Sequence, residues 1–193
     1  MIKTTEAIQM ISARLSPRRL QHSLMVAQTA RELAGDHGAD VAKAYLIGIL
    51  HDYAKNLPAE ELLAIAAAGE LVGHEIEILL PGLLHAPVGA YLLARDLNIE
   101  DQEILQAVRV HTLGSTNMSV MDKIIFLADM IEPSRKIYPD LERLRQLCTR
   151  DLDQAMLLGL ESTIRYCLER GTLLHPCTVE ARNAFLLQIE GQN

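Results

Sequence analysis

The twelve residues AYLIGILHDYAK, at positions 44–55, carry the strongest indication of the fold. Positions 44–50 hold no charged side chain and are apolar on every face of a helix, which predicts a helix buried on all sides. This segment runs directly into His51 and Asp52. An ionised carboxylate is almost never fully buried unless it is paired or bound to a metal ion. The stretch therefore predicts a buried helix whose end brings an imidazole and a carboxylate into the protein interior.

The remaining sequence also predicts helices, and no alternating run of polar and β-branched residues is long enough to predict a strand. Ser16-Pro17 and Asp40 are residue types that begin helices, while Gly35, Gly69 and Gly171 are expected helix ends. The expected helices cover about residues 17–34, 40–53, 58–68, 87–96, 100–111, 119–131, 151–170 and 178–190, with short ones beginning near 74 and 139. We therefore expect an all-α fold of about nine to ten helices in one domain covering residues 1–193.

The composition excludes several classes of function. With 18 basic and 25 acidic residues, the net charge of −7 argues against binding of nucleic acid, which depends on Lys and Arg. Aromatic residues make up 4% of the chain and Trp is absent, so bases have few stacking partners. No apolar run approaches the ~20 residues that span a membrane, and the first ten residues lack a signal-peptide core. Three cysteines without a Cys-x-x-Cys spacing favour a reducing, cytoplasmic location.

Two further positions resemble His51-Asp52 in their setting. His22 lies in the middle of an expected helix, and Asp129 lies in the apolar segment IIFLADMIEP. Imidazole nitrogen and carboxylate oxygen together suit iron, manganese or zinc. The alternative is structural: His22 forms a core hydrogen bond, and Asp129 pairs with Arg135 or caps a helix. A His-Asp dipeptide is common by chance among seven histidines and ten aspartates, so the order His, His-Asp, Asp in apolar helices carries the metal-site hypothesis.

Other candidate sites have less support. His37, between Gly35-Asp36 and Gly38, is expected in an exposed loop, and His74 is expected in solvent at the start of a short helix. The chain has no glycine-rich phosphate loop of the GxGxxG or Walker type. It also lacks the GxSxG pattern that surrounds a serine nucleophile.

The pattern His22, His51-Asp52, Asp129 resembles the HD-domain metal-dependent phosphohydrolases, an all-helical superfamily. The resemblance extends to one branch, the YqeK family of symmetrical diadenosine tetraphosphate hydrolases. It is carried by RRLQHSLMVAQTA, AYLIGILHDYAK, LLHAPVGAYLL, VRVHTLGS, DKIIFLADMIEPSR and GTLLHPCTVEARN, between residues 18 and 183. The superfamily pattern is moderately specific, whereas ADMIEPSR followed by LLHPCTVEARN is highly specific to this branch.

The resemblance implies a centre of two divalent metal ions, with iron expected and manganese or another first-row metal as alternatives. The implied metal ligands are His22, His51, Asp52, His85, His111 and Asp129. Asp52 would bridge both ions, and His85 is expected in a loop marked by Pro81-Gly82 and Pro87. Such a pair of ions generates hydroxide at neutral pH and cancels phosphate charge.

The implied reaction converts diadenosine tetraphosphate and water to two ADP, with Asp52, Lys55 and Arg135 as the catalytic residues. The metal-site core is expected at about residues 18–135, and helices at 140–190 would complete the nucleotide pocket. The expected nucleotide-binding residues are Arg18, Lys55, Thr112, Arg135, Gly171, Thr172, Leu173, Leu174, His175 and Pro176. The expected partner is a small-molecule nucleotide, and no binding to nucleic acid or membranes is expected. A homodimer is possible.

Two alternatives differ from this interpretation. One is another HD-domain phosphohydrolase, acting on a nucleoside monophosphate, a cyclic dinucleotide or a guanosine alarmone. The chain lacks the GYP motif of cyclic-dinucleotide phosphodiesterases, so a cyclic dinucleotide is less favoured as the substrate. The other is a nucleotide-binding sensor that holds metal ions without turnover. A turnover assay with added metal separates the sensor from both enzymes.

Overall fold

The computed structural model describes residues 2–191 and is all-α, with no strand in this part of the chain. Its elements are α1 (Thr4–Arg14), α2 (Pro17–Asp36), α3 (Val41–Leu50), α4 (Ala59–Ala68), α5 (Glu75–Leu79), the 3-10 helix η1 (Pro81–Leu84), α6 (His85–Leu97), α7 (Gln102–Val110), α8 (Val120–Ile131), α9 (Leu141–Cys148), α10 (Leu152–Arg170) and α11 (Pro176–Glu190). The expected fold class is confirmed. The eleven α-helices of residues 2–191 exceed the expected nine to ten because α1 was not anticipated.

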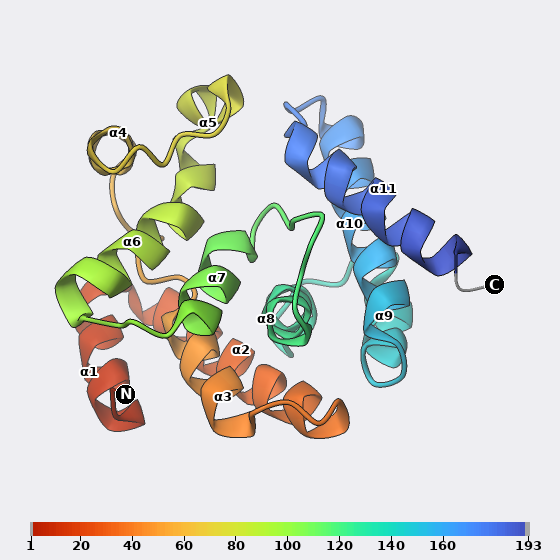
Figure 1. The fold of residues 1–193 in the computed structure, drawn as a ribbon, viewed down its shortest axis with the longest axis horizontal. Helices are drawn as coiled ribbons and strands as arrows, with labels where there is room; N and C mark the ends of the chain where they lie inside the picture. The colour runs from red at the N-terminus through yellow and green to blue at the C-terminus, as the bar shows by residue number, and fades with distance from the viewer. Residues whose placement is uncertain (1, 192–193) are drawn as a thin grey trace.

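Helices α2, α3 and α8 pack against one another, with α8 near the middle of the view in Figure 1 and α2 and α3 below it. Helix α3 is buried at Ala44 and from Leu46 to Leu50, as its uniformly apolar sequence predicts. It packs against α2 so closely that a Cβ atom added at Gly48 would lie 2.8 Å from the backbone nitrogen of Ala27. This approach brings the helices that carry the first half of the predicted site into direct contact.

Other helices form two groups, one on either side of α8 in Figure 1. Helices α4 and α5, with η1, lead into α6, which packs against α7. Helices α10 and α11 pack against each other, and α10 also contacts α8 and α9. The ends of α3, η1 and α7 and the C-terminal half of α8 supply most of the predicted ligands.

Three expected helix boundaries are wrong. Helix α3 ends at Leu50 rather than near position 53, and a turn follows it. Gly35 does not end α2, which continues to Asp36 before Gly38 adopts a positive φ of 66°. The amide of Ala39 then donates to the carbonyl of Ala34 at 2.9 Å, a hydrogen bond typical of a helix ended by a left-handed glycine.

His85 is not in a loop, because it is the first residue of α6. Pro87 is compatible with this helix because it lies in the first turn, where backbone amides have no acceptor within the helix.

Two smaller expectations also change. The last helix begins at Pro176 rather than Thr178, with His175 as its N-cap. His37 is not a free loop residue: it is half-buried at the end of α2, and its Nε2 lies 2.6 Å from the carbonyl oxygen of Cys148. This bond ties the end of α2 to α9.

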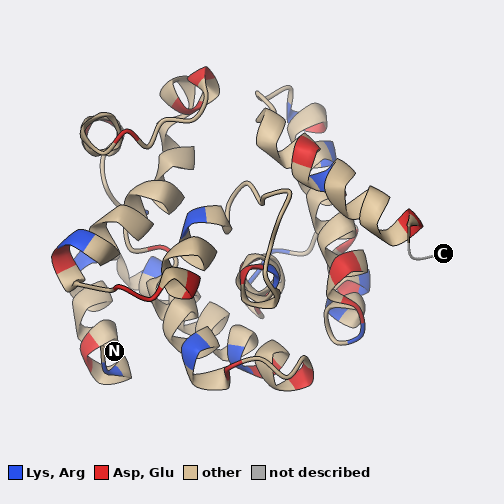
Figure 2. Cartoon of the chain, viewed as in Figure 1, with Lys and Arg blue, Asp and Glu red and all other residues tan. Residues whose placement is uncertain are grey.

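Basic and acidic residues are interspersed over the helices rather than collected on one of them (Figure 2). Within residues 2–191, no helix combines the length and apolar character needed to cross a membrane.

Candidate metal centre

The six predicted ligands come from five helices. His22 lies in the second turn of α2, and Asp129 lies in the last turn of α8. His51 is the C-cap of α3 and Asp52 follows it. His85 begins α6, and His111 is the C-cap of α7. The structure brings all six together.

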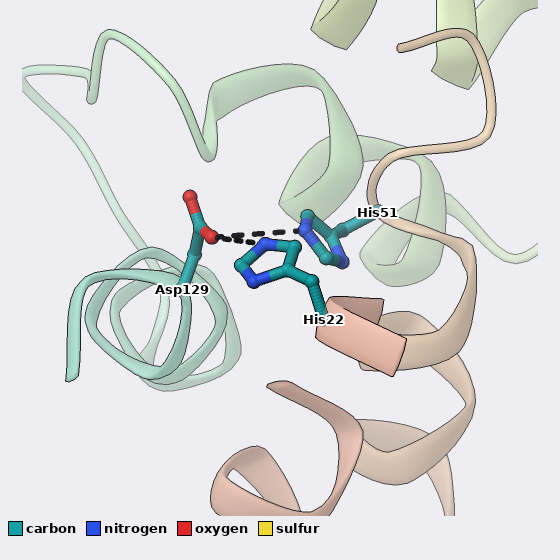
Figure 3. Close-up of side chains that lie close together, drawn as sticks. All are labelled: His22, His51 and Asp129. Carbon is teal, nitrogen blue, oxygen red and sulfur yellow. Dashed lines mark ion pairs between the residues drawn. The ribbon is translucent and has the colours of Figure 1, made fainter. Parts of the chain in front are cut away.

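His22, His51 and Asp129 form the first half of the centre (Figure 3). Oδ1 of Asp129 lies 2.9 Å from Nε2 of His22 and 3.8 Å from Nε2 of His51. Figure 3 shows the carboxylate of Asp129 pointing from α8 toward both imidazoles. Three ligand atoms from three different helices therefore converge on one point.

Asp52 presents one carboxylate oxygen to each half of the centre. Its Oδ2 lies 3.9 Å from Nε2 of His22 and 3.7 Å from Nε2 of His51. Its Oδ1 lies 3.4 Å from Nε2 of His85 and 3.8 Å from Nε2 of His111. The side chain is 3% exposed, so these imidazoles and their neighbours replace water around it. This is the arrangement expected of a carboxylate that bridges two cations.

Three of the four imidazoles are oriented by helix-end carbonyl groups. Nδ1 of His51, His85 and His111 lies 2.6–2.7 Å from the carbonyl oxygen of the third residue before it. Carbonyl groups at a helix end lack an intrahelical donor and are free to accept this bond. Because a carbonyl oxygen only accepts, each of these Nδ1 atoms carries the hydrogen, and each Nε2 presents a lone pair to the centre.

These convergent lone pairs fit divalent metal ions. Nε2 of His51 is buried and has no hydrogen-bond partner among the described residues, while Nε2 of His22 faces the Asp129 carboxylate. Nε2 of His85 and Nε2 of His111 lie 3.1 Å apart, an arrangement that a cation between them would stabilise. The described residues contain two groups whose ligand atoms all lie within 4.8 Å of one another: His22, His51 and Asp129, and His51, Asp52 and His111. Imidazole with carboxylate suits iron, manganese or zinc.

The protonation states also suit metal binding. Burial lowers the pKa of His51 and of His85 to about 4, so both imidazoles are neutral at pH 7. Burial alone would raise the pKa of Asp52, but the imidazoles of His51, His111 and His85 and the ammonium of Lys55 together outweigh burial, and the pKa lies well below its ordinary value. For Asp129, the contacts with His22, Arg135 and His51 together likewise outweigh burial and lower the pKa. Neutral imidazoles and ionised carboxylates are the forms that coordinate metal ions.

The chelated protein should lose stability as the pH falls from 7 to 5. The unfolded chain binds protons at His51 and His85 near pH 6.5, whereas the folded chain binds them only near pH 4. The contact with Asp129 raises the pKa of His22 despite burial, so protonation of His22 stabilises the folded protein as the pH falls. This single group opposes the two imidazoles of His51 and His85, whose protonation destabilises it. We expect the melting temperature, measured in excess chelator, to fall by several degrees. A melting temperature that is constant or rises over this range would contradict the assignment.

Basic side chains surround the centre. Nζ of Lys55 lies 3.1 Å from Nε2 of His85, and burial lowers the pKa of Lys55. Arg135 donates to the Asp129 carboxylate, and its Nε also donates to the Asp129 carbonyl at 2.6 Å. Nη1 of Arg19 donates to Oδ2 of Asp52 at 3.2 Å.

Arg19 was missed by the sequence analysis, which favoured Arg18. Both lie about one turn before His22, so spacing alone does not choose between them. In the structure Arg18 is exposed, while Arg19 contacts Asp52. Glu132 was also not among the predicted site residues. Its position directly after a buried apolar helix could have indicated a buried carboxylate that needs a hydrogen-bond partner.

The predicted nucleotide-binding residues lie in two separate parts of the structure, the metal centre and the segment 171–176. Oγ1 of Thr112 lies 3.1 Å from Nε2 of His85, within the centre. The segment 171–176 instead connects α10 to α11 and begins with Gly171 at a positive φ of 60°. There His175 accepts a hydrogen bond from the Cys177 amide, and its Nε2 lies 3.5 Å from Oε1 of Glu77. Leu173 is 48% exposed, so an apolar surface is available beside this segment.

Comparison with known proteins places this centre in a family. The HD domain family matches residues 19–134, and this match together with the helical fold and the His/Asp centre defines the chain as an HD-domain protein. The symmetrical bis(5′-nucleosyl)-tetraphosphatase of Halalkalibacterium halodurans is 40% identical over 183 residues, which cover 95% of this chain and 97% of that protein. The chain belongs to the family of symmetrical bis(5′-nucleosyl)-tetraphosphatases within the HD-domain proteins.

Two further similarities support this placement. The symmetrical bis(5′-nucleosyl)-tetraphosphatase of Bacillus subtilis is 38% identical over 173 residues, covering 90% of this chain and 92% of that protein. A crystal structure from Clostridium acetobutylicum, of a predicted HD superfamily hydrolase involved in NAD metabolism, has a TM-score of 0.92. It is 34% identical and covers 97% of this chain and 99% of its own.

Proposed function

We propose that this protein hydrolyses diadenosine tetraphosphate symmetrically, converting one substrate and one water molecule to two molecules of ADP. The observation that carries this proposal is Asp52, whose two carboxylate oxygens face separate pairs of imidazoles. Such a geometry suits two cations rather than one. The family relationship supplies the substrate, since relatives at 38–40% identity over most of the chain are symmetrical tetraphosphatases.

We infer that the six ligands hold two divalent ions, with iron as the first candidate and manganese as the second. When bound, such ions activate water at neutral pH and neutralise charge on the phosphates. The protein keeps Asp52 and Asp129 ionised and the buried imidazoles of His51 and His85 neutral for this purpose.

The basic side chains would hold the polyphosphate. Arg135 is 35% exposed, and its guanidinium, which donates to Asp129 through Nε and Nη2, has further N–H donors for a phosphate oxygen. Arg19, 38% exposed beside Asp52, and the partly buried Lys55 beside His85 would offset charge along the same chain of phosphates. Arg18 stays a proposed outer contact, since its exposed side chain lies on the same helix.

The nucleosides would bind farther from the metal ligands. We assign Thr112 to a phosphate contact and the segment 171–176 to a base contact, where Leu173 offers an exposed apolar surface. In this proposal residues 1–193 form one phosphohydrolase domain with its metal-site core at about 18–135, and the helices between 140 and 190 complete the pocket. Residues 1, 192 and 193 lie outside the described part of the structure. The three free cysteines suit a cytoplasmic location.

Product analysis in isotopically labelled water tests the proposed reaction. Chelated protein is reconstituted with Fe²⁺ or Mn²⁺ and incubated with diadenosine tetraphosphate. ADP should be the only nucleotide product, and label should enter half of the ADP molecules because water attacks one of the two halves. Chelated protein without added metal is the control and should be inactive.

Two results would contradict the proposal in different ways. Equal amounts of ATP and AMP would show that cleavage occurs one phosphate away from the central anhydride bond. Absence of cleavage with every first-row metal would favour the sensor, which retains the ligands without turnover. Cleavage of other nucleotides in preference to diadenosine tetraphosphate would favour a different HD-domain phosphohydrolase.

A further inference from the structure

Glu132 has a buried carboxylate that contacts His22 on the side of the imidazole opposite the other metal ligands. It is the C-cap of α8, is 1% exposed, and belongs to a helix that packs against α2. Its Oε1 lies 3.1 Å from Nδ1 of His22, 110 residues away in the sequence. The opposite nitrogen of His22, Nε2, lies 2.9 Å from Asp129. Glu132 therefore contacts the side of the imidazole that faces away from the metal ligands.

His22 needs such a partner because of where it lies. The other three imidazoles of the centre stand at helix ends and use free backbone carbonyl groups to orient Nδ1. His22 lies inside α2, where the carbonyl groups of the preceding turn already accept helical hydrogen bonds. A side-chain acceptor from another helix replaces the missing backbone acceptor.

The carboxylate of Glu132 is itself held in place. The amide of Ser134 donates to its Oε2 at 2.6 Å, and the hydroxyl of Ser134 donates to its Oε1 at 2.7 Å. Arg145 from α9 donates to the backbone carbonyl of Ile131 at 3.1 Å and thereby fixes the end of α8. These contacts aim Oε1 at His22.

We propose that Glu132 is the positioning residue of the metal centre: it holds the hydrogen of His22 on Nδ1 and directs the Nε2 lone pair toward the metal beside Asp129. The inference rests on the metal binding in the proposed function. A carboxylate behind a ligating imidazole fixes its tautomer and orientation and raises its basicity, and loss of such a partner costs about 10- to 100-fold in metal affinity.

Glu132→Gln is the sharpest variant because it keeps the shape of the side chain. The amide of Ser134 only donates, so the new side-chain oxygen must stay at the position of Oε2. The new NH₂ group then occupies the position of Oε1 and donates to Nδ1 of His22. The hydrogen of the neutral imidazole moves to Nε2, which removes the lone pair that would bind the metal.

Asp122→Asn is the matched control. Asp122 is a second buried carboxylate on α8, 2% exposed, in the capping box with Ser119 at the other end of the helix. The two positions are ten residues apart, about 15 Å along the axis. Both variants neutralise a buried carboxylate of α8, but only Glu132→Gln changes a contact to His22.

The test measures the affinity of the full-length chain for Mn²⁺ by calorimetry and the Nδ1–H signal of His22 by ¹⁵N NMR of protein loaded with diamagnetic Zn²⁺. We expect Glu132→Gln to bind Mn²⁺ about 10- to 100-fold more weakly and to lose the hydrogen-bonded Nδ1–H signal of His22, while Asp122→Asn keeps the wild-type affinity and signal. Wild-type affinity in Glu132→Gln, or equal loss in both variants, would overturn the inference.

The wild-type protein separates this inference from the proposed function. If wild type binds Mn²⁺ and the two variants differ as expected, the positioning role stands even when diadenosine tetraphosphate is not cleaved. If wild type binds no divalent metal under any condition, the positioning role fails together with the metal centre.

Discussion

Replacing Asp52 by alanine should reduce hydrolysis of diadenosine tetraphosphate about a thousandfold or more. The substitution removes the only carboxylate whose two oxygens face both pairs of imidazoles among the described residues. Loss of about 4 kcal/mol of transition-state stabilisation corresponds to this factor, and a bridging ligand contributes to both ions at once. Steady-state turnover with added Mn²⁺, together with metal content per chain, measures the effect.

His37→Ala is the control for Asp52→Ala. His37 lies fifteen residues beyond His22 on α2, about 22 Å along the helix axis, and its Nε2 contacts the Cys148 carbonyl. Loss of that bond should cost about 1 kcal/mol of stability and leave turnover nearly unchanged. Wild-type turnover in Asp52→Ala would place the active site elsewhere, and loss of turnover in a folded His37→Ala protein would show that the centre extends to the end of α2.

Gly48→Ala should destabilise the protein severely. A methyl group at this position would meet the Cα atom and nitrogen of Ala27, and backbone atoms in a packed helix pair cannot move aside as a flexible side chain does. Overpacking of this kind costs about 3 kcal/mol, or roughly 6–12 °C in melting temperature for a chain of this size. Because the Gly48 carbonyl also orients His51, metal affinity should fall as well. Thermal unfolding and Mn²⁺ titration check both effects.

Gly35→Ala provides the matched comparison. Gly35 lies inside α2, and a Cβ atom added there meets nothing within 4 Å. Alanine is preferred over glycine inside a helix by about 0.5–1 kcal/mol, so this variant should be slightly more stable than wild type. Equal melting temperatures for Gly48→Ala and wild type would show that α2 and α3 do not pack as closely as described.

The helices could largely be predicted because their signals are local. The apolar run at 44–50, the N-caps Ser16 and Asp40 and the left-handed Gly171 all act within one or two turns of the chain. The errors came where two signals compete. Gly35 is compatible with a helix interior when Gly38 supplies the left-handed end, and Pro87 is compatible with a first helical turn.

The ligands of the metal centre could be predicted for a different reason. An imidazole or a carboxylate in an apolar helix has few ways to avoid the cost of burial, so His22, His51-Asp52 and Asp129 stood out. The resemblance to a known family added His85 and His111. Their roles as ligands stay predictions, while the structure confirms that the six side chains converge.

What the sequence by itself determined is therefore the all-helical fold and the residue types of the centre. Only the tertiary structure decided which neighbours serve them: Arg19 rather than Arg18 beside Asp52, and Glu132 behind His22. The physical reason is the range of the interactions. Helix formation and burial cost depend on residues a few positions apart, whereas the orientation of His22 depends on a carboxylate 110 residues away that the packing of α2 against α8 brings within 3.1 Å.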